Sequence, residues 1–121
     1  MKIIRLTAVP HMTVDANGSK GFSIGAFGQT ADASLVMVSL KPRGVIGQHR
    51  AAARQLLVVI DGDATVTGAD DAPEAIGPGQ AAVWSPGELH ETRTEGGLTA
   101  LVVEGDVDVA TPGHLVDRGD T

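Results

Sequence analysis

Apolar residues occur in this chain as short runs that are separated by glycine, proline and polar residues. The clearest runs are SLVMVSL (34–40), QLLVVI (55–60), ATVT (64–67), AAVW (81–84) and LTALVVE (98–104). Each run is shorter than an ordinary helix, and several are rich in β-branched residues, which favour extended backbone. No apolar stripe with the helical period is long enough to indicate a helix. The pattern therefore predicts a series of β-strands.

The segments between these runs have the composition of tight turns. DGD (61–63) joins two expected strands, and an Asp-Gly pair suits the positive φ angles of a hairpin turn. Further turns are expected at GADDAP (68–73), GPG (77–79), SPG (85–87) and EGG (95–97). Many short strands joined by such turns predict an all-β protein, with an antiparallel sandwich or barrel.

Two further strands are expected before residue 34. They are KIIRLTAV (2–9) and GFSIGAF (21–27), with DANGSK (15–20) as a loop between them. A strand at the edge of a sheet exposes unpaired N–H and C=O groups, which can pair with another chain. On this ground we expect a homodimer. The polar residues 117–121 are expected to be frayed.

Composition narrows the classes of function. A chain of 121 residues suits one domain with a buried core. Its net charge of −6 and its scattered Lys and Arg residues argue against binding to a nucleic acid backbone. The absence of cysteine excludes disulfides, thiolate metal sites and thiol nucleophiles. No apolar run approaches the roughly 18 residues of a membrane span, and no signal-peptide core is evident. We therefore expect a cytoplasmic protein without nucleic acid or membrane partners.

Two segments bring histidine close to an apolar strand. The first is GVIGQHRAAARQLLVVIDG (44–62), which contains His49 and Gln55, and the second is GQAAVWSPGELHETRT (79–94), which contains His90. Imidazole nitrogens are ligands for divalent transition metals. Histidines beside an apolar pocket can equally be hydrogen-bonded residues that orient an organic ligand. The residues alone leave both interpretations open.

These two segments resemble the two sequence motifs of the cupin family. The first motif is G-x5-H-x-H-x3-E-x6-G, and His49 stands at its first histidine. The second is G-x5-P-x-G-x2-H-x3-N, and His90 stands at its histidine, with Ser85 and Thr94 at the proline and asparagine positions. The resemblance implies a single-domain jelly-roll barrel, or double-stranded β-helix, over residues 1–121. The barrel core is expected at about residues 34–104, preceded by N-terminal strands within 1–33.

The resemblance also implies a metal site with an incomplete ligand set. Metal-binding cupins hold one divalent ion with both histidines and the acidic residue of the first motif and the histidine of the second. Carried over by position, His49, Gln55 and His90 would hold a single Fe, Mn, Ni, Cu or Zn ion, while Ala51 replaces a ligand. Because Gln55 is a neutral amide, it lacks the charge of a carboxylate. Glu88, close to His90, is a candidate substitute for that charge.

A ligand pocket is expected beside the same residues. Alternation along a strand points every second residue after Gln55 to the same face, which gives the pocket an apolar wall. For Trp84 two roles remain open, at the mouth of the pocket or as part of the core. The expected pocket residues are Met37, Leu57, Val59, Trp84 and Leu101.

Two functions are compatible with this site. The first is the binding or transformation of a small organic molecule in the barrel pocket, with a degenerate metal site. The alternative is a metal-dependent small-molecule enzyme of dioxygenase or isomerase type, using His49, Gln55 and His90. Without a metal, His49 or His90 can still act as a catalytic general acid or base. Arg50 and Arg54 could hold an anionic substrate, although such residues are more often solvated surface charges.

Overall fold

The computed structural model describes residues 10–29 and 32–107 of the chain. The strand expected at residues 2–9 and the tail at 117–121 lie outside this part. The described residues form nine strands and one short 3₁₀ turn, η2 (Ala16–Gly18). The strands are β1 (Met12–Val14), β2 (Lys20–Gln29), β3 (Ala33–Arg50), β4 (Arg54–Gly62), β5 (Ala64–Thr67), β6 (Glu74–Ile76), β7 (Ala81–Trp84), β8 (Leu89–Arg93) and β9 (Leu98–Gly105).

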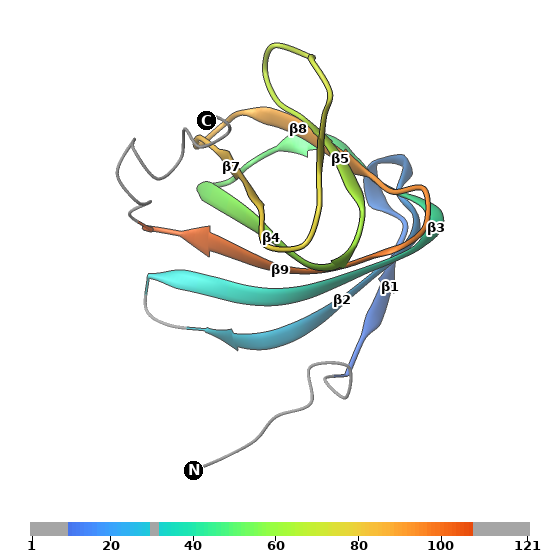
Figure 1. Cartoon of the computed structure of the whole chain (residues 1–121). Coiled ribbons are helices and arrows are strands. Elements are labelled where there is room, and N and C mark those ends of the chain that lie inside the picture. Colours follow the sequence, from blue (N-terminus) through green and yellow to red (C-terminus); the bar gives the residue numbers. More distant parts are fainter. Residues whose placement is uncertain (1–9, 30–31, 108–121) are drawn as a thin grey trace.

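The strands pair antiparallel into one curved sheet that almost closes into a barrel (Figure 1). Their order is β6-β5-β8-β3-β9-β4-β7, and β2 pairs with β3 and carries β1 at its other edge. The long strand β3 connects the two sides, because its first part pairs with β9 and its last part pairs with β8. The predicted all-β jelly-roll barrel is confirmed. Within the described residues, no helix is of a length and apolarity that would let it cross a membrane.

The core consists of aliphatic side chains that point inward from facing strands. Register places these side chains in rows across the barrel, because residues that pair on neighbouring strands point to the same face. One row is Val36, Val102 and Leu57, and the next is Val38, Ala100 and Val59. Burial of each Val or Leu side chain contributes roughly 1.5–3 kcal/mol to folding. Small aliphatic residues thus fill one end of the barrel, and a cavity remains beyond them.

Candidate functional site

A cavity of about 270 Å³ lies inside the barrel and is bounded by β1–β4, β8, β9 and the η2 segment. A cavity of about 150 Å³ can hold benzene, so this one suits a molecule of roughly ten non-hydrogen atoms. Half of its lining residues are Val, Ile, Leu or Phe. The polar lining residues are Asn17, Ser19, His49, Gln55, His90, Thr92 and Glu104. The three residues expected as metal ligands therefore line one cavity.

A register shift in β3 turns His49 into this cavity. On β3, Val36, Val38 and Ile46 line the cavity, and all three have even numbers. Strict alternation would point the odd-numbered His49 outward. The pairing of β3 with β8 shifts register between Ile46 and His49, which changes the face to which odd-numbered residues point. His49 then pairs with His90 of β8, and the two ring centroids lie 4.3 Å apart.

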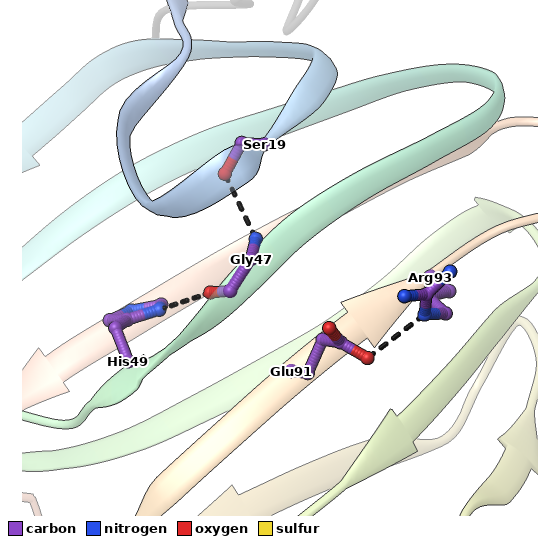
Figure 2. Close-up of polar contacts among 5 residues, drawn as sticks. All are labelled: Ser19, Gly47, His49, Glu91 and Arg93. Atoms are coloured by element: carbon purple, nitrogen blue, oxygen red, sulfur yellow. Dashed lines mark hydrogen bonds and ion pairs between the residues drawn. The ribbon is translucent and has the colours of Figure 1, made fainter.

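The His49 ring is held by its own backbone. Nδ1 donates a hydrogen bond to the Gly47 carbonyl oxygen at 2.8 Å, and a carbonyl can only accept (Figure 2). The Gly47 N–H in turn donates to the Ser19 hydroxyl at 2.9 Å. Since Nδ1 carries the proton, the neutral ring keeps its lone pair on Nε2. Nε2 has no hydrogen-bond partner among the described residues.

Gly47 also lets the η2 segment close one side of the cavity. A Cβ atom at position 47 would overlap the backbone carbonyl of Asn17, so only glycine permits this close approach. Ala16 and Asn17 of the turn line the cavity together with Ser19. Hydrogen bonds through Gly47 thus connect the segment around η2 to the His49 ring.

His90 is almost fully buried, with 2% of its surface exposed. Its Nδ1 lies 3.1 Å from the Glu88 carbonyl oxygen and its Nε2 lies 3.1 Å from Gln55 Oε1; both partner atoms only accept, so the neutral ring donates to one of them. Trp84 packs behind it, with ring centroids 4.4 Å apart. Burial lowers the pKa of His90, and the Glu88 carbonyl partly opposes this effect. Both His90 nitrogens therefore face acceptor oxygens of the protein.

Glu104, which the sequence analysis did not identify, supplies a carboxylate to the same cavity. It is the register partner of Gln55 across β4 and β9. Its Oε2 accepts hydrogen bonds from Gln55 Nε2 at 3.1 Å and from the Ala52 N–H at 3.3 Å. His90, Gln55 and Glu104 therefore form a continuous hydrogen-bonded chain. Alternation in LTALVVE places Glu104 on the inward face with Ala100 and Val102, and this is the signal in the sequence that points to it.

The residues at the motif positions do not fit a metal ion as they are arranged. Two of the three expected donor atoms, His90 Nε2 and Gln55 Oε1, are bonded to each other. Ala51 has no donor side chain. In the part of the chain that the structure describes, no group of three or more His, Asp or Glu side chains is placed to hold a metal. As arranged, these side chains form hydrogen bonds within the protein.

Glu88 and the two motif arginines bind to backbone groups. The Glu88 carboxylate accepts hydrogen bonds from the N–H groups of Ser85 and Ala69, both at 2.9 Å, so it connects two loops. Arg50 donates to the Gly87 carbonyl, and Arg54 donates to the Val107 carbonyl. None of Glu88, Arg50 and Arg54 lines the cavity.

Of the five expected pocket residues, Leu57 lines the cavity. Val59 and Trp84 belong to the core cluster, where the Trp84 Nε1–H donates to the Thr67 carbonyl. Met37 and Leu101 are register partners on the opposite face of the sheet from Val38 and Ala100. The lining therefore differs from the expectation, because strand alternation in β3 and β9 selects their even-numbered residues, Val36, Val38, Val102 and Glu104.

A nearly closed antiparallel barrel, with residues of two motifs meeting at one internal cavity, defines a jelly-roll protein of the double-stranded β-helix class. The chain belongs to the cupin family, because the family model described as a cupin domain matches residues 36–113. A comparison with curated proteins gives no match.

Solved cupin structures have the same fold. The polyketide cyclase RemF from Streptomyces resistomycificus is 20% identical, with 98% of this chain and 93% of RemF covered and a TM-score of 0.75. A predicted oxalate decarboxylase from Thermotoga maritima is 16% identical, with 86% and 98% covered and a TM-score of 0.75. A cupin-2 domain from Rhodospirillum rubrum is 15% identical, with 98% and 87% covered and a TM-score of 0.72. At these identities the likeness concerns the fold alone.

Proposed function

We propose that this cupin binds a small, largely apolar organic molecule in its barrel cavity, without a metal ion at the motif positions. The observation that carries the proposal is His49 Nε2, an acceptor without a partner among the described residues, on the wall of an otherwise mainly apolar cavity. Such a wall binds the body of a ligand, and a few polar atoms fix its orientation. His90 and Gln55 have a supporting role here, because their donors and acceptors are bonded to each other.

The size of the cavity limits the affinity. Burial of apolar surface contributes roughly 25 cal/mol per Å², and association entropy offsets much of this gain for a ligand of about ten atoms. For a simple fragment we therefore expect a Kd of roughly 0.1–1 mM.

The proposal is tested with benzyl alcohol as the probe and ligand-observed NMR as the measurement. In Val102→Phe the new ring would occupy the cavity, because Val102 lines it, and binding should be lost. Val103→Phe is the matched control, since the adjacent residue on β9 points to the other face. Equal binding by wild type and Val102→Phe, or no binding by wild type, would contradict the proposal.

A second candidate function is proton transfer by His49, which the exposed lone pair on Nε2 favours. A base in this position would remove a proton next to a ligand carbonyl. We expect wild-type protein to catalyse deuterium incorporation into phenylacetone in D₂O, and His49→Gln to lose this activity. Exchange no faster than in buffer with free imidazole would exclude the activity for this probe class.

We also propose that two copies associate through the edge strand β1. Within the described part of the chain β1 pairs only with β2, and Met12 is 66% exposed. An unpaired strand edge can add a strand from a second copy. Sedimentation should show a dimer that Met12→Lys weakens, and a wild-type monomer at all concentrations would contradict the dimer.

The cytoplasmic location stays a prediction.

A further inference from the structure

We propose that the ligand of this cavity is a small organic cation, with an amine-type head beside Glu104 and an apolar body against the aliphatic wall. This inference rests on the proposed function, because it names the chemical class of the ligand of the same cavity. It follows from the charges and hydrogen-bond acceptors that the described residues place there.

Among the described residues, the cavity wall contains a carboxylate and no Lys or Arg. Glu104 is the only Asp or Glu among its lining residues. The nearby arginines, Arg50 and Arg54, donate to backbone carbonyls and do not pair with it. A carboxylate or phosphate ligand would therefore meet like charge without a compensating cation.

Glu104 is half-buried and is held only by neutral groups. Gln55 and the Ala52 N–H both donate to Oε2, and Oε1 has no hydrogen bond within the described residues. The ion pair found in this part of the chain joins Glu91 and Arg93 on β8 and does not involve Glu104 (Figure 2). A partly desolvated carboxylate gains most from a cation that reaches it.

His49 provides a second acceptor on the same wall. Its ring contacts His90, which is joined through Gln55 to Glu104, so His49 and Glu104 lie on the two sides of this pair. An ammonium group has several N–H donors, so it can bond to Glu104 and still offer N–H groups to other acceptors of the cavity wall, whereas a single hydroxyl has one donor. The Val, Ile and Phe wall then contacts the apolar part of the molecule.

The test compares four probes that share a phenyl ring: benzylamine, benzyl alcohol, toluene and benzoate. Calorimetry at pH 7.5 should give benzylamine a Kd about tenfold or more below that of benzyl alcohol, the size expected for a charge-assisted hydrogen bond. Benzoate should bind weakest. Glu104→Gln should abolish the preference for benzylamine and leave toluene binding unchanged.

Glu91→Gln is the matched control, because it removes one negative charge from the exterior of the barrel and should keep the preference. If benzyl alcohol binds as tightly as benzylamine, or benzoate binds best, the cation inference is overturned while cavity binding stands. If none of the four probes binds, the proposed function itself fails. The wild-type ranking decides the question if Glu104→Gln does not fold.

Discussion

Individual side chains at this site are joined by hydrogen bonds. Gln55 stands where the metal-binding cupins have a carboxylate, and its amide bonds to His90 on one side and to Glu104 on the other. An amide can do this because it carries both a donor and an acceptor, whereas an ionised carboxylate only accepts. The negative charge is therefore still present, but it comes from β9 and not from the motif.

Restoring the missing ligands should create a metal site. We expect Ala51→His combined with Gln55→Glu to raise Zn²⁺ affinity by more than the ~10–100-fold that outer-shell groups contribute. Calorimetry with Zn²⁺ measures the effect, and Ala52→His with Gln55→Glu is the control because residue 52 is not a motif position and is exposed. No gain in the double variant would show that these side chains do not surround one point.

Gly47→Ala tests the close contact between β3 and the η2 turn. The added methyl group would overlap the Asn17 carbonyl, so backbone must move and unfolding should require about 2–3 kcal/mol less free energy. Gly77→Ala should change stability little, because no other atom approaches a Cβ built at that position. Urea denaturation compares the two, and equal stabilities would contradict the described packing.

At the scale of the elements, apolar runs predicted some strands better than others. The runs at 55–60, 64–67, 81–84 and 98–104 correspond to β4, β5, β7 and β9. The run at 34–40 is only the first part of β3, which continues to Arg50 through KPRG (41–44). That segment resembles a chain break, yet it is where β3 bends from its pairing with β9 to its pairing with β8. Pairing with neighbours, and not local composition, keeps it extended.

Asp63 joins two turns of the barrel. Its hydrogen bonds should make the free energy of unfolding depend on pH in the acid range. Its carboxylate accepts hydrogen bonds from the N–H groups of Glu95 and Gly96 and from the Thr94 hydroxyl. The Glu95 N–H contributes most to lowering the pKa of Asp63 below 3.8. A lowered pKa means that the unfolded chain binds the proton first, so this stabilisation is present above 3.8 and is lost as pH falls through the folded-state value.

The comparison of wild type with Asp63→Ala isolates this contribution. The difference in their unfolding free energies should be constant from neutral pH to about pH 5 and should shrink below about pH 4. Denaturation at a series of pH values measures it. A difference that does not change with pH in this range would show that the Asp63 carboxylate is not held in its charged form.

At the scale of the whole molecule, the sequence was sufficient to predict the barrel because two spaced motifs and regular turns agree on one fold. The same motifs identified His49, Gln55 and His90, which the barrel brings to one cavity. Glu104 could not be recognised in this way, because its proximity to Gln55 depends on the register between β4 and β9. For the same reason Met37 and Leu101 were expected on the wrong face of the sheet.

The central claim is that the barrel cavity binds a small organic molecule without a metal ion. The most direct test follows the methyl signals of Ile, Leu and Val in an NMR titration with benzyl alcohol in the presence of EDTA. The account predicts shifts for Ile24, Ile46 and Leu57, which line the cavity, and none for Ile60 and Val83, which are exposed outside it. Unchanged chemical shifts of the cavity methyl groups, or changes that appear only when a divalent metal replaces EDTA, would contradict this claim.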